Sequence, residues 1–467
     1  MSQITKPVIL DETGREIVRA IKTLNVGFWA EKEKHIPTKD VNFYDCDGTV
    51  LYAYTAAEFL ALSEMPANPA RDGLTAQGWN WTLSNAQTYV GKYGVCEIGQ
   101  MYVTDDGKTR AVIDVGEPER LTAKLKFTQS AASVVTVDWG DGSQTETASA
   151  VQAALTHTYA AAGRYTITLE AAENTTYQIG NNGTFQGGFI GMGDNFTGRS
   201  ILKELYIGAG VTAIPPQGLW MQTNLEILTI PQGVTTIGAR SLESMISLRA
   251  LVLPRGVMAL GDYVCRTDYN MEVLCLPDTV TDIGSGFQTC VNLKRVTVPE
   301  GVTAIKQQAF IRCFSAEVIQ VPDTVTTFGS GAFESCYALV ALNIPDGVTA
   351  IPNSLCRACH SLRLTELPEG VTSIGQMAFS ACFGFENFTI PSTVTSIGKF
   401  AFLFNDGASS ITMLSTTPPT LEPTAFWDTI LVAIYVPYSA DHSVLNAYLA
   451  ATGWSSLGDK IVEVAAS

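Results

Sequence analysis

A repeat with a period of 23 residues fills the middle and C-terminal part of the sequence. The unit reads L-x-x-L-x-I-P-x-x-V-T-x-I-G-x-x-A-F-x-x-C, and nine copies extend from about residue 202 to residue 407. Its valine recurs every 23 residues, with one step of 22, at Val211, Val234, Val257, Val280, Val302, Val325, Val348, Val371 and Val394. A unit this short cannot bury its own apolar side chains and has to stack on its neighbours. The period therefore predicts an elongated solenoid.

Each unit predicts two short β segments and one large core side chain. Leu228 and Ile230 belong to a short apolar strand that Pro231 ends, because proline has no N–H to donate to a ladder. Residues 234–237 form a second segment with β-branched threonines at the outward positions. Gly238 permits a tight bend, and the next large apolar residue, Phe in several copies, enters the core.

Five of the ten cysteines follow the same period. They lie three residues after the core aromatic position, which predicts an inward ladder of small apolar side chains, at Cys290, Cys313, Cys336, Cys359 and Cys382. Neighbouring rungs could pair as disulfides, but without a secretion signal reduced thiols are favoured. Cys356 and Cys359 also form a C-x-x-C, yet both occupy repeat positions and no second C-x-x-C exists, so no metal is predicted.

These repeats resemble the BspA-type leucine-rich repeat of bacterial surface proteins over about 200 residues. Residues 408–467, which include T-T-P-P-T-L-E-P-T-A-F and A-Y-L-A-A-T-G-W, resemble the C-terminal cap of such arrays. A terminal cap has to cover the apolar end of the last coil. We expect Trp427 and Trp454 to be the large side chains that seal it.

Residues 118–173 contain a second recognisable unit. W-G-D-G at 139–142 and H-T-Y-A-A-A-G-R-Y at 157–165 resemble a PKD-type immunoglobulin-like domain, and the alternating runs predict a small β-sandwich. Asp138, Asp141 and His157 could be ligands for a metal ion. The favoured alternative is that Asp141 makes a turn while Trp139 and Tyr159 pack in the core. Residues 174–201, rich in Gly and Asn, are expected to form an irregular loop leading into the repeats.

Residues 37–117 predict a small α+β domain. A hairpin is expected around Asp47–Gly48, although Asp45 and Asp47 also have the start of a calcium loop, whose later ligands are missing. Capping boxes predict helices beginning at Thr55 and at Ser84. A second hairpin is expected at residues 101–115, turning at Asp106–Gly107.

The first 36 residues carry apolar side chains at steps of 4, 3 and 4, at Ile17, Ile21, Leu24 and Phe28. This rhythm is that of a helix that seeks a partner, which would allow a homotrimer, or of one amphipathic helix lying on its own domain. With P-V-I-L-D-E-T-G-R-E-I-V at 7–18, F-Y-D-C-D-G-T-V-L-Y at 43–52 and G-L-T-A-Q-G-W-N-W at 73–81, the N-terminal region resembles phage or prophage structural proteins of gut bacteria. That resemblance implies contacts with other virion proteins.

Composition excludes several classes of function. With 45 Asp+Glu and 29 Lys+Arg the formal charge is −16, which argues against nucleic acid as a partner. Hydrophobic residues make up 46% and charged residues 16%, so a large core is available. No apolar stretch suits membrane insertion, and the start of the chain lacks a signal-peptide core. We therefore expect a protein that is made in the cytoplasm or that leaves it by a route that needs no cleaved signal.

Catalytic motifs are missing from the sequence. The four histidines are scattered, and neither a nucleophile elbow nor a phosphate loop occurs, so no catalytic residue, cofactor or enzymatic activity is predicted. Binding is the expected use of the solenoid, and one row follows the cysteine ladder directly, at Phe314, Tyr337, His360 and Phe383. These rings either grip a protein or glycan or pack between coils. A second row of outward strand residues, which includes Thr229, Thr297 and Arg363, is expected to be solvated.

The combined prediction is a phage or prophage virion-associated protein whose repeats adhere to a host-surface protein or glycan. The alternatives are a BspA-like adhesin of the bacterial surface and an intracellular interaction scaffold.

Overall fold

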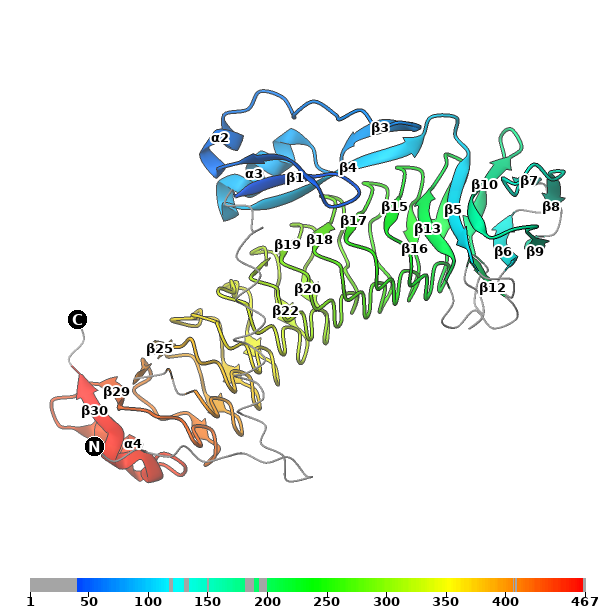
Figure 1. Ribbon diagram of the computed structural model, residues 1–467. Helices are drawn as coiled ribbons and strands as arrows, with labels where there is room; N and C mark the ends of the chain where they lie inside the picture. The colour runs from blue at the N-terminus through cyan, green and yellow to red at the C-terminus, as the bar shows by residue number, and fades with distance from the viewer. Residues whose placement is uncertain are drawn as a thin grey trace, which may run out of the picture.

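The computed structural model describes residues 40–116, 121–129, 134–148, 151–180, 189–192, 200–405, 407 and 410–464. The helix proposed for oligomerisation, with Ile17, Ile21, Leu24 and Phe28, lies outside these residues. The described chain forms an N-terminal domain, a β-sandwich and a long solenoid (Figure 1). None of the described helices is long and apolar enough to span a membrane.

The N-terminal domain has one four-stranded sheet, of order β2-β1-β4-β3, and two short helices. Its elements are β1 (Val41–Tyr44), β2 (Val50–Tyr54), α2 (Ala56–Leu60), β3 (Leu74–Trp79), α3 (Leu83–Tyr93) and β4 (Cys96–Thr104). The hairpin predicted around Gly48 is confirmed, because β1 and β2 pair antiparallel and Gly48 has a φ of 86°. The capping box of Thr55 and Glu58 is present. The second helix is capped by Thr82, which accepts from the Asn85 N–H, so Ser84 was the wrong residue.

The second predicted hairpin is wrong, and this changes how the domains connect. The turn at Asp106–Gly107 exists, but β4 stays in the N-terminal sheet while β5 (Thr109–Val115) enters the sandwich. There β5 pairs with β10 (Gly163–Ala171) on one side and with β13 (Leu202–Tyr206), the first solenoid strand, on the other. The sequence could not show this, because a D-G turn with β-rich flanks fixes a reversal but not the partner of each flank.

The sandwich and the solenoid share both of their sheets. One sheet has the order β15-β13-β5-β10-β7-β8, and the other has β12-β6-β11-β14-β16 with β9 beside β6. The sandwich strands not yet located are β6 (Thr122–Gln129), β7 (Val135–Asp138), β8 (Glu146–Ala148), β9 (Gln152–Thr158), β11 (Tyr177–Ile179) and β12 (Ile190–Met192). The sandwich therefore caps the first coil directly, and β11 and β12 lie in the segment expected to be an irregular loop.

The solenoid has about 11 turns, two more than the nine repeats that the sequence shows. Parallel strands from successive coils pair along it. Their bounds are β14 (Val211–Ile214), β15 (Ile227–Thr229), β16 (Thr236–Ile237), β17 (Ala250–Val252), β18 (Val273–Cys275), β19 (Arg295–Thr297), β20 (Ala304–Ile305), β21 (Val318–Gln320), β22 (Thr327–Phe328), β23 (Ala350–Ile351), β24 (Ser373–Ile374), β25 (Asn387–Ile390) and β26 (Ser396–Ile397).

The C-terminal cap continues the same parallel sheets. It holds β27 (Ser410–Met413), β28 (Thr420–Leu421), β29 (Ala433–Pro437), α4 (Ser443–Ala450), a 3-10 turn (Ser455–Lys460) and β30 (Ile461–Val464). Strands β25, β27, β29 and β30 form one parallel sheet. Trp454 is fully buried and donates its indole N–H to the Pro419 carbonyl at 2.8 Å, as expected of a sealing residue. Trp427 is 61% exposed and seals nothing, so that prediction is wrong.

One apolar core runs through the sandwich, the solenoid and the cap, from Ala111 to Ile461. Within it the core aromatics stack coil on coil, as in Phe287 on Phe310 and Phe310 on Phe333. The N-terminal domain has a core of its own around Phe43 and Trp79. The N-terminal domain therefore has a core separate from that of the solenoid, and the two meet through their surfaces.

Candidate binding surfaces

Strand β4 of the N-terminal domain lies against the solenoid strands β15, β17, β18 and β19 (Figure 1). Tyr44 and Met101 form a small apolar cluster with Val252 and Cys275. Gly99 lets the two sheets come this close, because a Cβ there would lie 2.4 Å from Cγ1 of Val252. The N-terminal domain is therefore docked on the strand face of the middle coils.

Polar side chains of the N-terminal domain reach the backbone carbonyls at the ends of the solenoid strands. The donors are Asn80 Nδ2 to Cys275 O at 2.9 Å, Trp81 Nε1 to Leu276 O at 2.8 Å and Tyr89 Oη to Val298 O at 2.8 Å. Each contact gives a carbonyl at or just after the end of a solenoid strand a donor from the N-terminal domain, so the docked surfaces do not bury these donors without a partner. At the two ends of the contact, Gln77 bonds to Gln232 and Tyr93 accepts from the Asp323 N–H.

Glu97 and Arg295 form the charged centre of this contact. Arg295 Nε donates to Glu97 Oε1 at 2.7 Å, and the two side chains are 14% and 3% exposed respectively. Burial raises the pKa of the Glu97 carboxyl, while the adjacent Arg295 charge and the hydrogen bond from Tyr44 oppose that rise. The Glu97 N–H also donates to Thr297 Oγ1 at 3.0 Å. A buried pair of this kind fixes the register of the two sheets.

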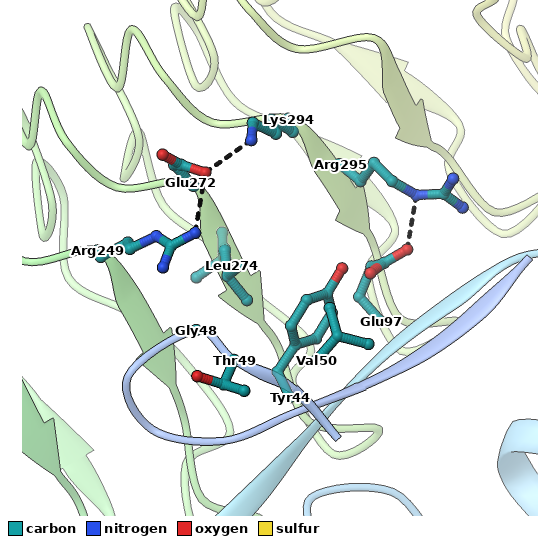
Figure 2. A pocket seen from close by; sticks show the side chains of 11 residues that line it. Tyr44, Gly48, Thr49, Val50, Glu97, Arg249, Glu272, Leu274, Lys294 and Arg295 are labelled. Atoms are coloured by element: carbon teal, nitrogen blue, oxygen red, sulfur yellow. Dashed lines mark hydrogen bonds and ion pairs between the residues drawn. The ribbon is translucent and has the colours of Figure 1, made fainter. Parts of the chain in front are cut away.

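A cleft of about 330 Å³ opens beside this pair (Figure 2). The β1–β2 hairpin, with Gly48 and Thr49, forms one wall, and the solenoid strands form the other. Glu272 lies across from the hairpin and pairs with Lys294 at 2.6 Å and with Arg249 at 3.7 Å. The cleft is thus a polar gap between two domains, lined by three cationic and two anionic side chains. Among the residues that the structure describes, no three His, Cys, Asp or Glu side chains are placed to hold a metal ion.

The docking overturns the expectation of a solvated outward row. Thr229 and Thr297 are each only 2% exposed, because the N-terminal domain covers their strands. Further along the solenoid Arg363 and Glu366 are exposed. The strand face is therefore covered over the middle coils and open over the later ones.

The four rings that follow the cysteine ladder stack face to face along the solenoid. Centroid distances are 4.7 Å from Phe314 to Tyr337, 4.6 Å from Tyr337 to His360 and 4.9 Å from His360 to Phe383. The spacing is that of the coils, which bond through the backbone beside each ring, as Ala338 does to Phe314. The first three rings are half-buried and Phe383 is 41% exposed. The ring faces pack on one another, as the packing alternative predicted, while binding of a protein or glycan by these rings stays a prediction.

His360 is held neutral within this stack. Burial lowers the pKa of His360 to about 4, since the charged imidazolium would lose its hydration between two aromatic rings. Its Nδ1 is buried without a hydrogen-bond partner among the described residues. The stack is thus aromatic and uncharged at neutral pH along its whole length.

The ladder cysteines are buried, free thiols with a bonding role that the sequence did not reveal. Each Sγ donates to a carbonyl in the preceding coil, for example Cys313 to Phe287 at 3.2 Å and Cys336 to Phe310 at 3.2 Å. Burial raises the pKa of the Cys313 thiol to about 12. The other ladder thiols bond likewise, at Cys290, Cys359 and Cys382.

Polar residues extend this ladder at both ends. Asp268, one coil before Cys290, accepts from the Met245 N–H at 2.8 Å, and Asn405, one coil after Cys382, accepts from the Cys382 N–H at 2.7 Å. All three kinds of side chain tie one coil to the backbone of another. The position therefore requires a small hydrogen-bonding group, which cysteine, asparagine and protonated aspartate all supply.

In the sandwich, Trp139 and Tyr159 are 1% exposed and pack in the core, as the favoured alternative predicted. His157 Nε2 lies 2.7 Å from Asp141 Oδ2 and the imidazole stacks on Trp139. Hydrogen bonds from Ser143 and His157 lower the pKa of Asp141 to about 2. His157 therefore links the turn at Asp141 to Trp139 in the core of the sandwich.

Comparisons with known proteins place these features. Residues 212–340 and 328–448 match the BspA type Leucine rich repeat region in six copies, and residues 105–176 match the PKD domain. The repeat solenoid and the PKD-like sandwich are thereby confirmed, and the sandwich match includes β5. No match was found among the curated proteins.

Three solved structures share partial similarity with the chain. A leucine-rich repeat protein of Bacteroides ovatus is 18% identical, with a TM-score of 0.35 over 56% of this chain and 84% of that one. A leucine rich cell surface protein of Faecalibacterium prausnitzii is 21% identical, with a TM-score of 0.28 over 52% and 91%. The pneumococcal vaccine antigen PcpA is 11% identical, with a TM-score of 0.31 over 61% and 95%.

Proposed function

Because the chain belongs to the BspA-type leucine-rich repeat family, we propose that it is a non-enzymatic adhesion protein that binds a host-surface protein or glycan. The observation that carries this proposal is the uneven use of the solenoid surface. The N-terminal domain covers the strand face over the middle coils, and the coils from about residue 341 onward keep theirs open. We assign binding to these later coils and to the ring stack of Phe314, Tyr337, His360 and Phe383.

The ring stack suits a binding role because it is preorganised. Three ring–ring contacts fix every side chain, so little side-chain entropy is lost when a partner covers the outward edges. Phe383 ends the stack and is its most exposed member. A partner therefore meets a rigid, uncharged aromatic ridge on a surface that otherwise carries mixed charges.

Adhesion of the purified full chain to host cells tests the proposal. We expect Phe383→Ala to reduce adhesion severalfold with little loss of stability, because the side chain is 41% exposed. Exposed Val340→Ala, outside the stack, is the matched control and should leave adhesion unchanged. Tyr337→Ala should both weaken adhesion and lower the melting temperature. If Phe383→Ala and the control adhere equally, the stack is only packing.

The place of action is proposed from two separate lines of support. The resemblance of the N-terminal region to phage structural proteins favours a virion, where that region would meet other virion proteins. The repeat family favours a bacterial cell surface. Mass spectrometry of purified virions and surface labelling of intact cells distinguish the two, and absence of the chain from particles would rule out the virion. Light scattering tests the homotrimer by comparing the molar mass of the unchanged full chain with that of the variant carrying Ile21→Ser and Leu24→Ser.

A further inference from the structure

We infer that the C-terminal cap carries a binding site for a neutral sugar ring, centred on Trp427. This inference rests on the proposed adhesion function and names a subsite and a ligand class for it. Trp427 is 61% exposed, whereas Trp79, Trp81, Trp139 and Trp454 are all buried. A side chain of this size exposed on a folded surface costs hydration free energy unless a partner covers it.

Trp427 is held ready for stacking. Its ring lies on Phe400, with centroids 5.6 Å apart and planes inclined by 28°, and the Phe400 ring also carries the Lys399 ammonium 4.8 Å from its centroid. The Trp427 N–H of the backbone donates to Thr424 O at 3.1 Å. One side of the indole is thus supported from the preceding coil, and the residue also lines a cavity of about 360 Å³. That volume is at the small end of ligand pockets.

The rim of this cavity offers free polar groups of both signs. Asp428 and Lys460 line it together with Trp427, Thr424 and Leu457. Within the described part of the chain, neither the Asp428 carboxylate, the Lys460 ammonium nor the Trp427 indole N–H has a hydrogen-bond or ion-pair partner. One acceptor and two donors therefore line the cavity beside an aromatic ring, and none of the three is bonded to another described residue.

This combination favours a neutral pyranose over other occupants. A sugar presents an apolar C–H face that stacks on an aromatic ring and a rim of hydroxyls that both donate and accept. The cavity is lined by one carboxylate, Asp428, and one ammonium, Lys460, so neither an anionic nor a cationic sugar gains a net attraction over a neutral one. A stable protein partner buries about 800 Å² on each side, so it would have to extend well beyond the residues that line this cavity.

Titration of the intrinsic tryptophan fluorescence tests the site directly. The full chain is titrated with lactose, cellobiose, N,N′-diacetylchitobiose and methyl α-mannoside. We expect saturable binding of at least one of them, and Trp427→Ala should weaken this binding about tenfold or more. The affinity of Trp427→Ala is measured by calorimetry, because this variant lacks the indole whose fluorescence reports binding. Trp427→Phe should retain part of the affinity. Tyr438→Ala, which removes a 56% exposed aromatic residue of the same cap outside the cavity, is the control and should bind as the unchanged chain does.

Three results would overturn the inference: no binding of any of the four sugars, equal binding by Trp427→Ala, or equal loss in Tyr438→Ala. Host-cell adhesion measured on the same samples separates this inference from the adhesion proposal. Sugar binding without adhesion to cells leaves the site standing and removes the adhesion function. If no sugar changes the tryptophan fluorescence and Trp427→Ala still adheres to cells, the sugar site is ruled out and the adhesion function stands. Adhesion is then assigned to the ring stack.

Discussion

Arg295, on a solenoid strand, donates a 2.7 Å hydrogen bond to Glu97, which lies 198 residues earlier in the N-terminal domain. The pair is almost completely shielded from water. Replacing either partner alone leaves an uncompensated charge in the contact, which we expect to cost about 3–5 kcal/mol of stability. Urea denaturation of Glu97→Leu, Arg295→Leu and the double variant measures this cost. The double variant should lose much less than the sum of the two single losses, and strict additivity would contradict a direct pair.

Gly99→Ala tests whether the close approach of β4 to the solenoid holds the two domains together. The new methyl group would lie 2.4 Å from Val252 Cγ1 and 2.9 Å from Cys275 Cβ, so the sheets must separate at a cost of about 1–3 kcal/mol. Hydrogen exchange of β17 to β19 should then accelerate. Gly91→Ala is the control, because the site on α3 is open and alanine should stabilise the helix by up to about 1 kcal/mol. Adding Val252→Ala to Gly99→Ala should restore part of the protection.

The docking itself could not be predicted from the sequence, although the solenoid could. Every coil repeats its core residues, so the period alone sets which side chains point inward. The contact of β4 has no such internal copy. One weak signal was present in the sequence: Gly99 lies inside the strand, where a glycine often marks a place at which another backbone comes close. Thr229 and Thr297 were misjudged for the same reason, since their cover comes from a distant segment.

Positions with a left-handed backbone were also hidden. Most coils have two of them, four residues apart, as at Met377 and Ala381 with φ of 55° and 58°. The residues there are rarely glycine, so their identity gives no hint of the conformation. Trp427 illustrates a further limit, because an aromatic residue in a cap can either seal the core or stand on the surface. The packing around each residue decides between these two outcomes, and it buries Trp454 and leaves Trp427 exposed.

Asp268→Asn should stabilise the fold in a pH-dependent way. Burial raises the pKa of Asp268 well above its usual value, so the folded chain keeps a proton that the unfolded chain releases above about pH 4. Its contribution to stability is therefore complete below the unfolded pKa and declines as the pH rises toward the folded pKa. Asparagine keeps the acceptor for Met245 and cannot ionise. The gain in melting temperature should be large at pH 7.5 and small at pH 4. Asp346→Asn, at an exposed position, is the control for the substitution itself, and a pH-independent gain at Asp268 would contradict this explanation.

The buried thiols should be unreactive in the folded chain. All ten cysteines are free and buried, and the pKa of about 12 at Cys313 leaves almost no thiolate at pH 8. Ellman's reagent should therefore react slowly until guanidinium unfolds the chain, after which ten thiols should appear. Val340→Cys, at a position 45% exposed, should add one fast thiol and calibrate the assay. Rapid reaction of several native thiols would mean that the coils open readily.

The N-terminal domain spans the solenoid from Gln232 to Asp323, so its two ends are fastened to coils that are several turns apart. A stack of coils under tension unravels from its ends, since each coil is held only by its neighbours. The docked domain is bonded to the solenoid at both ends of the segment from Gln232 to Asp323, so part of a pulling force on this segment passes through the domain. When a bound surface pulls on the chain, the later coils and the cap should give way first, and the bridged segment should survive as a stiff rod.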